Sequence, residues 1–566
     1  MPVNVTESAI ISQALIAAAR EMGAKLIRSA FSTIVREASD ASAAILDVRG
    51  QVIAQAELIP IQLGSLAATF GYCAELNPPE TLEEGDFYIN NDPYHGGQHL
   101  PDVFIFSPIF FRKKVIGFAA TVAHHIDIGG GAPGLNMTAR ELCQEGLIFP
   151  PGRYNLQRDW NGGTLERFIA ANVRVPDQTI GDFYAQFAGN SIGAARVQQL
   201  CHKYGANTVA RTMAELMDYS ERRMRAAIAV VPDGTFRGED WIDDDGDGNA
   251  PIPIKAAVTI KGDSLAVDFA GTHAQVATNL NSPFASTVAS VYSCIKGVLT
   301  GSELPFNSGS SRPLTVSAPY GSLLNPRPPA PVRARMTSSF RAFNAVMKAL
   351  AKAVPDKVIA TGFDTTTGPY LSRRGETGYR VYHEIVGGGF GASSHKDGCS
   401  GVDGPISNCS NTPVESLDMD FDFFRVREYG LLPDSGGQGR FRGGLGIRRV
   451  YEITKDGVQF AQYGDRFRLR PEGLFGGEPG SAASCFIVRN GKKLPVKSKD
   501  WGMLQKGDRL VLQTGGGAGY GSPAHRSRED MARDISEGWN SKRKARKIDG
   551  AAGKRGKHLP NPGRRR

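Results

Sequence analysis

The sequence lacks a disulfide framework, a membrane-length apolar run and a phosphate-binding loop. Its seven cysteines are scattered over 566 residues without a Cys-x-x-Cys pair, which favours reduced thiols in a cytoplasm. The apolar runs are too short to span a bilayer, and Glu7 stands where a signal peptide carries basic residues. Because no G-x-x-x-x-G-K-[ST] motif occurs, the chain offers no nucleotide site of its own. We expect a cytoplasmic protein without a membrane segment.

The formal charge of +9 belongs to one end of the chain. Residues 541–566 contain eleven Lys or Arg and one Asp, a local charge of +10 that leaves −1 for the rest. This distribution argues against nucleic-acid binding by the body of the protein. The segment 526–566 is expected to be a basic, disordered tail. Contact of the tail with an acidic partner or RNA stays open as an alternative to a solvated end without a ligand.

The length and the pattern of the sequence predict a multidomain α+β fold with mixed sheets. A chain of this size holds about three or four domains, and its apolar content of 41% and charged content of 22% are ordinary for a soluble protein. The expected regions are an N-terminal α/β region with the functional site, a central mixed region, a β-rich and glycine-rich region, and the tail. Their boundaries are placed at residues 1–232, 233–410, 411–525 and 526–566.

Hydrophobic periodicity places most elements. Residues 313–331 are rich in proline and are expected to be irregular. Residues 428–488 alternate and turn often, as in a sandwich or barrel. Helices are predicted over 7–30, 182–200, 207–230, 283–299 and 339–354, and strand hairpins over 43–56 and 256–269.

The stretch from Phe87 to Gly134 is rich in polar residues that can bind a metal or take part in catalysis. Its halves, FYINNDPYHGGQHLPDVFIFSPIF and GFAATVAHHIDIGGGAPG, contain four of the ten histidines. Residues 103–111 and 115–122 read as strands joined by a short turn. Two strands joined in this way bring their far ends together, and those ends carry His99 and Asp102 on one strand and His124 and His125 on the other.

This pattern suggests a site with two imidazoles and a carboxylate. Such ligands suit zinc, manganese or iron(II), and three protein ligands leave a position open for water. A divalent metal lowers the pKa of water bound to it. Asp40, a short polar residue at the entrance of a strand, is a candidate fourth ligand. The alternative, a loop whose histidines are only hydrogen-bonded, stays open on spacing alone.

A second acidic motif resembles a calcium loop only in part. Asp243, Asp245 and Asp247 copy the first half of an EF-hand, but the ninth and twelfth positions are Pro251 and Ile254. We interpret this segment as an acidic turn without calcium.

Three glycine clusters lie in the second half of the chain, at residues 387–391, 436–446 and 515–521. None opens a helix within a βαβ unit, as a dinucleotide-binding loop does. We therefore expect tight turns and close backbone packing there.

Several long blocks resemble the hydantoinase B / 5-oxoprolinase β-subunit family. They include NNDPYHGGQHLPDV, AHHIDIGG and QEGLIFPPGR around the histidines, and FSTIVREASDASAAILDVRGQVIAQAELIPIQLGS near the N-terminus. The later blocks NSGSSRPLTVSAPYGSLLNPRPPAPV, NTPVESLD, DSGGQGRFRGGLG and TGGGAGYGSP follow in the expected order. The resemblance covers nearly the whole chain, to about Pro523, and excludes the basic tail.

The resemblance implies a division of labour between two proteins. Members of this family are β subunits that act with an ATP-binding, hydantoinase A-like α subunit of actin/hexokinase-like fold. The α subunit phosphorylates a poorly reactive carbonyl compound, and the β subunit carries a metal site that completes the reaction. Hydantoinases, 5-oxoprolinases and caprolactamase open a cyclic amide, whereas related ketone carboxylases add bicarbonate-derived carbon to acetone or acetophenone. A hetero-oligomer with a small cyclic amide as substrate is therefore expected.

The family's metal ligands correspond to His99, Asp102 and His124, with Asp40 as a further ligand. His125 and Asp127 are candidates for a proton-transfer role or for orienting the ligands, and a purely structural hydrogen-bonding role is the alternative.

Three other positions need a prediction. Gln62 in IPIQLGS stands where many relatives have histidine, so the metal preference or the chemistry can differ here. His383 and His395 flank the cluster at 387–391. They are interpreted as ordinary surface or turn histidines, and approach to a site from another domain is the alternative.

Three hypotheses follow from the resemblance. The first is the metal-dependent β subunit of an ATP-dependent cyclic-amide hydrolase acting on a hydantoin, 5-oxoproline or another lactam, which the chain length favours. The second is a subunit of a ketone carboxylase, which differs by its need for bicarbonate. The third is a non-catalytic scaffold, which would bind no metal.

Overall fold

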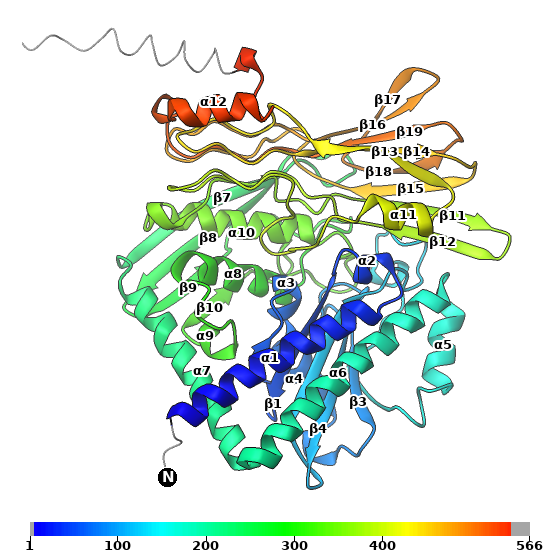
Figure 1. The fold of residues 1–566 in the computed structure, drawn as a ribbon, viewed down its shortest axis with the longest axis vertical. Helices are drawn as coiled ribbons and strands as arrows, with labels where there is room; N and C mark the ends of the chain where they lie inside the picture. Colours follow the sequence, from blue (N-terminus) through cyan, green and yellow to red (C-terminus); the bar gives the residue numbers. More distant parts are fainter. Residues whose placement is uncertain (1–4, 545–566) are drawn as a thin grey trace, which may run out of the picture.

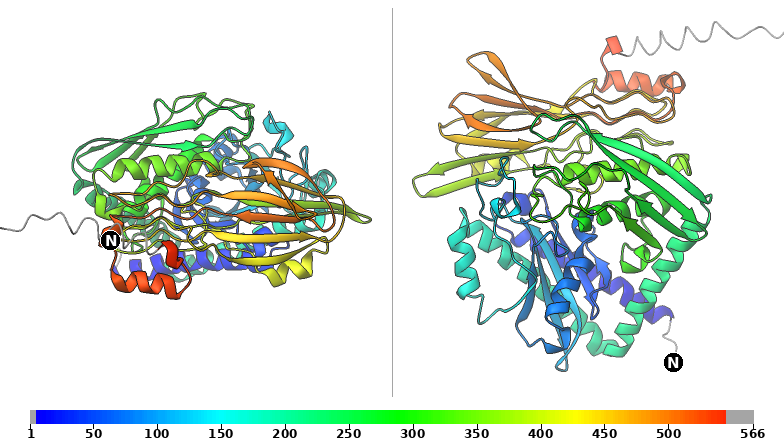
Figure 2. Two further views of the ribbon diagram at one scale, coloured as in Figure 1. Left: turned by 90° about the horizontal axis from the view of Figure 1, so that it is seen from above. Right: turned by 180° about the vertical axis from the view of Figure 1, so that it is seen from behind.

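The computed structural model describes residues 5–544. It contains four β-sheets and a set of helices, which confirms the α+β class with several mixed layers. Figure 1 places the N-terminal sheet at the opposite end of the molecule from the two C-terminal sheets. Seen from behind, in the right panel of Figure 2, the central sheet (green) lies beside the N-terminal sheet (blue). Within the described range, every helix is too short or too polar to cross a bilayer.

The N-terminal sheet is antiparallel and has six strands in the order β2-β1-β5-β4-β3-β6. The predicted hairpin at its centre is confirmed: β4 and β5 join through Arg112 and Lys113, both with positive φ. This backbone twist matches that of the flanking strands, so the hairpin stays tight. The strands are β1 (Ala41–Asp47), β2 (Val52–Gln55), β3 (Asp86–Asn90), β4 (Asp102–Phe111), β5 (Lys114–His124) and β6 (Gly152–Asn155).

Helices cover both faces of this sheet. On one face pack α1 (Val5–Ser29) and α6 (Pro176–Tyr204), as the long blue and cyan-green helices of Figure 1 show. The predicted stripe of α1 is buried there, including Ile11 and Leu15. On the other face, α4 (Leu66–Leu76) packs through residues such as Phe70. The sheet is therefore buried on both sides, and its chemistry is confined to its ends. The remaining N-terminal helices are α2 (Thr33–Arg36), α3 (Pro60–Leu63), α5 (Thr164–Asn172) and α7 (Ala206–Ala229).

The central region is a four-stranded sheet backed by helices. The sheet order is β10-β9-β8-β7, and α10 (Met336–Leu350) packs across β7 and β8. The segment 313–331, expected to be irregular, contains one short strand because residues 314–317 pair in parallel with β9. The other elements are β7 (Gly234–Ile242), β8 (Ile252–Lys261), β9 (Ser264–Asp268), β10 (Leu314–Ser317), α8 (Phe284–Leu299) and α9 (Ser308–Ser311).

The C-terminal region is β-rich, as predicted, and consists of two antiparallel sheets that share one apolar core. Helix α11 (Val414–Asp420) covers one edge of this core through Leu417. The first sheet is β12 (Gly378–His383), β11 (Gly368–Gly375), β15 (Val458–Tyr463) and β18 (Lys499–Leu504) in spatial order. The second is β13 (Phe424–Leu431), β14 (Ile447–Ile453), β19 (Arg509–Gln513), β16 (Ser484–Arg489) and β17 (Lys492–Val496).

The three glycine clusters pack directly against one another, as expected. A Cβ on Gly389 would lie 2.1 Å from the carbonyl oxygen of Gly444 and 2.2 Å from the nitrogen of Gly517. The backbone nitrogen of Gly517 donates to the oxygen of Gly444 at 2.9 Å. Because any side chain would push these segments apart, only glycine permits this backbone layer.

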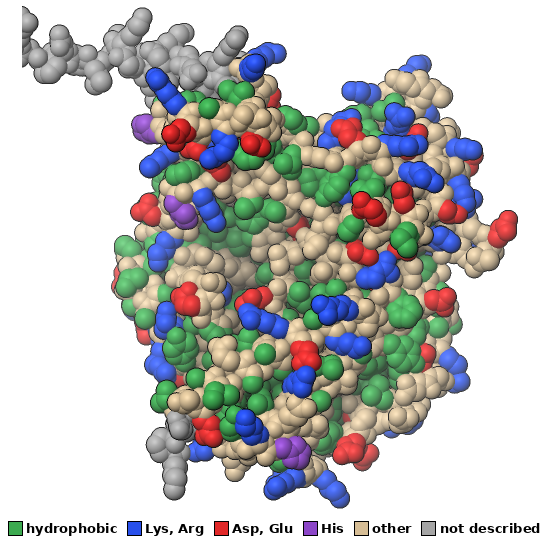
Figure 3. All heavy atoms as spheres, viewed as in Figure 1, with side chains coloured by type: hydrophobic (Ala, Val, Ile, Leu, Met, Phe, Trp, Pro, Cys, Tyr) green, Lys and Arg blue, Asp and Glu red, His purple; other side chains and the backbone are tan. Residues whose placement is uncertain are grey.

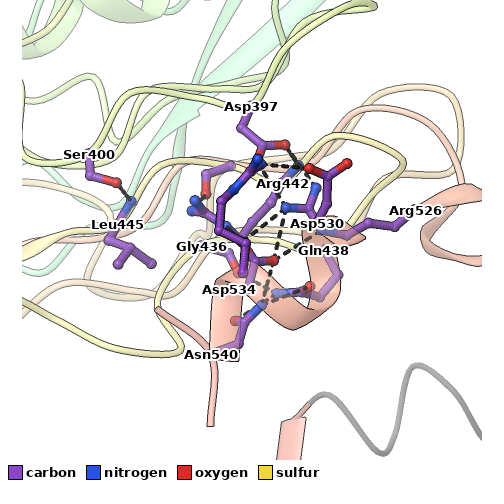
Figure 4. Close-up of polar contacts among 12 residues, drawn as sticks. Asp397, Ser400, Gly436, Gln438, Arg442, Leu445, Arg526, Asp530, Asp534 and Asn540 are labelled. Atoms are coloured by element: carbon purple, nitrogen blue, oxygen red, sulfur yellow. Dashed lines mark hydrogen bonds and ion pairs between the residues drawn. The ribbon is translucent and has the colours of Figure 1, made fainter. Parts of the chain in front are cut away.

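The prediction of a disordered tail from residue 526 is wrong for residues 526–544, which the structure describes. Helix α12 (Arg528–Ser536) begins at Ser527, whose hydroxyl accepts from the nitrogen of Asp530. Figure 4 shows how it docks: buried Asp534 faces both Arg442 and Arg526 at the glycine layer. The cap and these buried ion pairs outweigh the basic composition that suggested disorder. Residues 545–566, where most of the basic charge lies, are outside the described range.

The surface charge is mixed. On the face drawn in Figure 3, Lys and Arg side chains are interspersed with Asp and Glu. This agrees with the near-neutral charge of the chain body and does not resemble a continuous basic stripe for nucleic acid on that face.

A candidate metal centre at the end of the N-terminal sheet

Strand register brings the predicted ligands to one end of the sheet. Asp102, the first residue of β4, pairs with His124, the last residue of β5. On the other side of β5, Ala41 pairs with Ala123, so Asp40 immediately precedes β1 at the same end. His99 lies one turn before Asp102, whose nitrogen donates to the His99 oxygen. The juxtaposition inferred from two strands and a turn is therefore present.

The side chains converge as a metal site requires. His99 Nε2 lies 3.2 Å from His124 Nδ1 and 3.3 Å from Asp102 Oδ1, and His124 Nδ1 lies 3.4 Å from Asp102 Oδ1. These three residues, called here the ligand cluster, meet the geometric requirement for holding one ion. Asp40 Oδ2 is 3.5 Å from His124 Nδ1. All four residues are buried, with at most 8% of each exposed.

Backbone contacts orient His99 for ligation. Its Nδ1 lies 2.9 Å from the carbonyl oxygen of Arg333. A carbonyl only accepts, so Nδ1 carries the proton and Nε2 presents its lone pair to the cluster. The carboxylate of Glu145 accepts from the nitrogens of Val332 and Arg333, which fixes the peptide that orients the ring.

Burial and one guanidinium set the protonation states. Burial, with the charge of Arg335, holds the pKa of His99 well below its usual range, and burial lowers the pKa of His124 to about 4. Burial alone would raise the pKa of Asp102, but His99 and Arg335 hold it well below its usual range. Arg335 donates to Asp102 Oδ2 at 2.5 Å. At neutral pH the cluster therefore presents neutral imidazoles and an ionised carboxylate, the forms that bind a metal.

Asp40 and Gln62 complete the polar surroundings. Burial and the charge of Asp102 raise the pKa of Asp40 well above its usual range. Gln62 Nε2 donates to Asp40 Oδ1 at 2.9 Å and lies 3.3 Å from Asp102 Oδ1, while Ser42 donates to Gln62 Oε1. Gln62 thus links the two carboxylates. Two imidazoles and two adjacent carboxylates fit zinc, manganese or iron(II), and a cation between the carboxylates would offset their mutual repulsion.

A cavity of about 20 Å³ adjoins the cluster. That is room for one ion or one water molecule. Its walls come from all three regions of the chain. The central and C-terminal regions contribute Arg335, Met336, Thr366, His383, Ile385, Ser407 and Tyr463.

Sequence reasoning missed the part of the site that lies beyond residue 300. The interpretation of His383 as a surface or turn histidine is wrong: it is 1% exposed at the end of β12, and its ring centroid lies 5.7 Å from that of His124. Val381, Tyr382 and His383 are all buried at the end of this strand, so alternation along the strand gave no signal for His383. His395 is a turn residue whose Nδ1 contacts Ser394. Arg335 gave no local signal, because its partner Asp102 is more than 200 residues away.

His125 and Asp127 do not reach the ligand cluster. Successive residues of a strand face opposite sides, so His125 turns to α6, where its Nε2 lies 3.0 Å from Gln186 Oε1. Asp127 accepts from the backbone nitrogen of Arg174 and contacts its guanidinium. These contacts favour the structural alternative for both residues. His95 is half-exposed and bonds to Asp92.

The carboxylates of the acidic turn at residues 243–249 accept hydrogen bonds from neighbouring backbone and side chains. Asp243 accepts from the nitrogens of Phe467, Arg468 and Leu469. Asp245 accepts from the nitrogen of Asp247 and from Asn249. These bonds explain the acidic residues as a turn that binds neighbouring backbone.

Fold and site together define a multidomain α+β protein with a buried His/Asp cluster of metal-ligand type. The chain belongs to the hydantoinase B/oxoprolinase family, whose model matches residues 4–523. It is 34% identical over 552 residues to a protein of Pseudomonas sp. (strain NS671) that is named as the B component of a D-/L-hydantoinase, covering 93% of this chain and 91% of that one. The matched span agrees with the resemblance seen in the sequence.

Two solved structures share the fold. The crystal structure of the ATP-dependent caprolactamase from Pseudomonas jessenii superposes with a TM-score of 0.88 at 28% identity, covering 96% of each chain. A nucleotide-free structure of acetone carboxylase gives a TM-score of 0.86 at 18% identity, covering 96% of this chain and 79% of that one. The second likeness shows the fold alone.

Proposed function

We propose that this chain is the metal-dependent β subunit of an enzyme that opens a cyclic amide at the expense of ATP. The observation that carries the proposal is the ligand cluster: two neutral imidazoles and an ionised carboxylate, buried and oriented within 3.4 Å of one another. Family membership and the hydrolase names of relatives support the same reaction class.

A partner subunit supplies ATP chemistry in this proposal. The sequence has no phosphate loop, and a relative of similar length is named as one subunit of a hydantoinase. We assign ATP binding and phosphorylation of the substrate carbonyl to a hydantoinase A-like α subunit in a hetero-oligomer. A lactam carbonyl is a poor electrophile because its nitrogen donates into it, and phosphorylation of the oxygen weakens that donation.

In this proposal, the residues of this chain orient the metal ligands for the hydrolytic step that follows phosphorylation. Arg333 keeps His99 in the tautomer that offers Nε2, and Arg335 binds Asp102 through Oδ2, which leaves Oδ1 at the cluster. Gln62 holds Asp40 beside Asp102. A divalent ion bound by these side chains would polarise a carbonyl or phosphoryl oxygen and make water more acidic. The burial of all four side chains limits the access of bulk water to the reacting groups.

Metal content tests the proposal first. Purified wild type, His99→Ala and Asp102→Asn are compared by elemental mass spectrometry, with His395→Ala as a control for loss of a histidine outside the cluster. We expect about one zinc, manganese or iron per chain in wild type and in His395→Ala, and none in the other two. Wild type that binds no metal even after reloading would overturn the proposal and favour a scaffold.

Bicarbonate separates hydrolysis from carboxylation. The complex with its ATP-binding partner is given hydantoin, 5-oxoproline or caprolactam with ATP, in buffers with and without bicarbonate. A hydrolase forms the ring-opened product equally in both buffers. Product that forms from a ketone, and only with bicarbonate, would replace our assignment with the carboxylase.

A further inference from the structure

Two buried polar side chains that line the cavity beside the ligand cluster have unsatisfied polar atoms. Among the described residues, the hydroxyl of Thr366 has no hydrogen-bond partner, and the ring of His383 has only a weak polar contact, with the backbone of Pro369. These residues are 1% and 3% exposed, and both line the cavity that adjoins the cluster. Buried polar groups in native proteins are nearly always hydrogen-bonded. Unpaired groups that border a cavity therefore indicate a ligand.

The ring of His383 is held rigidly. It stacks on Tyr370 at a centroid distance of 3.8 Å with 5° between the planes. A Cβ on Gly368 would lie 2.5 Å from its Cε1 and 3.1 Å from its Nδ1, so this edge is packed against backbone. Nε2 is then the nitrogen left to meet a ligand. Such fixing by neighbours is typical of preorganised functional groups.

The same support connects His383 to the ligand cluster. The hydroxyl of Tyr370 accepts from Arg333 Nη2 at 2.9 Å, and the carbonyl of Arg333 orients His99. One arginine therefore fixes a ligand imidazole and the residue against which His383 stacks.

Thr366 is also held in place. Its neighbours form a tight turn in which the nitrogen of Thr367 donates to the oxygen of Thr365 at 2.9 Å. Arg341 Nη2 donates to the hydroxyl of Thr365. The backbone of Thr366 is thus fixed on both sides while its own hydroxyl stays unbonded.

The size of the cavity selects the ligand. About 20 Å³ exceeds the 10–15 Å³ that one water needs, and a buried water requires two to four polar partners. The ring of a cyclic amide is too large for this space, so in the proposal it lies at the mouth of the cavity, which is not fully enclosed. The unpaired nitrogen of His383 and hydroxyl of Thr366 supply two partners next to the cluster.

We propose that His383 and Thr366 bind and orient the water molecule that opens the substrate ring. This inference rests on the proposed function and selects its hydrolase branch. The water oxygen bonds to the carbon of the phosphorylated carbonyl, the ring C–N bond breaks, and its electron pair stays on nitrogen, which takes up a proton that the water loses. The acyl phosphate left by this step is hydrolysed by a second water to the carboxylate and inorganic phosphate. Nε2 of His383 accepts one hydrogen bond from the water, and Thr366 fixes its position. Both are catalytic residues in the sense that they touch a reacting molecule.

The test uses the complex with its ATP-binding partner and whichever of hydantoin, 5-oxoproline and caprolactam the wild type opens. The variants are His383→Gln and Thr366→Val, with Thr366→Ser as the conservative replacement. Thr212→Val is the matched control, because Thr212 is another buried threonine with an unpaired hydroxyl, on α7 outside the site.

We expect Thr366→Val and His383→Gln to lower kcat by about 10²-fold, as misplacement of a reactant by 1 Å does. KM, metal content and the first-turnover burst of ADP should stay near wild type, since the partner's step comes earlier. Thr366→Ser should recover most of kcat, and Thr212→Val should change nothing. A merely structural role would instead lower the melting temperature and affect all steps together.

A readout without turnover completes the test. A high-resolution crystal structure of the wild type should show a water within hydrogen-bonding distance of His383 Nε2 and Thr366 Oγ1, and the structure of Thr366→Val should lack it. Full activity of both variants, together with an unchanged water in Thr366→Val, would overturn this inference while leaving the proposed function intact. A wild type that binds no metal would instead overturn the proposed function.

Discussion

Two clusters of buried charge lie close together in this protein, and they are built on opposite principles. In one, called here the arginine network, Asp240 pairs with Arg466 at 2.6 Å and Asp465 pairs with Arg341 at 3.0 Å. Lys499 adds a further cation 3.3 Å from Asp465. In the ligand cluster, the guanidinium of Arg335 binds Asp102. The carboxylate of Asp40 beside it meets the imidazole of His124 and the amide of Gln62.

The difference distinguishes structure from function. A buried carboxylate matched by fixed cations is satisfied, and burial in such surroundings adds rigidity without inviting a ligand. Where imidazole lone pairs and a second carboxylate replace the cations, negative charge and electron pairs are left in excess, and a metal ion can use both. The pKa shifts of two aspartates show this contrast. Burial alone would raise the pKa of Asp240, but Arg466 and Lys348 hold it well below its usual range. Burial and the charge of Asp102 raise the pKa of Asp40.

The two clusters are also joined. Arg341 of the network donates to the oxygen of Asp364 and to the hydroxyl of Thr365. This holds the turn that places Thr366 at the cavity. The satisfied cluster thus supports the wall of the unsatisfied one.

Removing a ligand should have the largest effect. Asp102→Asn takes the ionised oxygen from the cluster, so we expect metal to be absent and ring opening to fall below detection. Elemental analysis and a turnover assay measure this, with circular dichroism to check the fold. If the variant keeps both metal and activity, the assignment of the ligand cluster as the metal site is wrong.

Breaking the arginine network should act on stability instead. Asp240→Asn leaves Arg466 buried without its counter-charge, which should lower the free energy of unfolding by about 3–5 kcal/mol. Urea denaturation measures the loss. Metal bound per folded chain should be that of wild type, and a specific loss of metal at unchanged stability would contradict the assignment.

A third kind of carboxylate sharpens the comparison through pH. Asp182, on α6, accepts mainly from the backbone nitrogens of Phe31 and Ser32, and burial raises its pKa to about 6. A raised carboxyl pKa stabilises the fold below the unfolded pKa near 3.8, and this stabilisation is lost as pH rises through about 6.

Relative to Asp182→Asn, wild type should therefore lose roughly 3 kcal/mol between about pH 4 and pH 6.5. Denaturation of both proteins across that range measures the difference. If the free energies of unfolding of the two proteins change in parallel with pH, the pKa of Asp182 is not raised in the folded state.

The smallest effect is expected at Gln62. Replacement by leucine removes the amide that links Asp40 to Asp102, and loss of such an outer contact weakens metal binding by about 10–100-fold. Competition with a chelator measures this affinity. Gln198→Leu, which removes an amide bonded to the oxygen of Phe110, should leave it unchanged. Equal affinities in both variants would make Gln62 a packing residue.

The sequence was sufficient for the local half of the site. His99, Asp102 and His124 belong to one hairpin, so strand spacing alone predicted their meeting, and Asp40 follows from the strand beside it. Alternation along β5 could also have turned His125 away, because neighbours on a strand face opposite sides. The arrangement of long-range packing could not be read in this way.

Arg335 and His383 reach the cavity from elements more than 200 residues beyond the hairpin. Their placement depends on how three regions pack, which periodicity does not encode. Helix α12 was missed for another reason: the capping serine of SREDMARDIS lies in a segment whose overall basic composition dominated the prediction.

The route of the chain through the site also has a consequence in time. His124, the last of the four metal-binding candidates, is translated 339 residues before Tyr463, the last residue to line the cavity. At about 5–20 residues per second, roughly 17–68 s separate the two. During that interval the ribosome has delivered every candidate ligand but not the cover that later closes over them. If the cluster holds a metal as proposed, its four candidate ligands are all synthesised well before the last residue that lines the cavity.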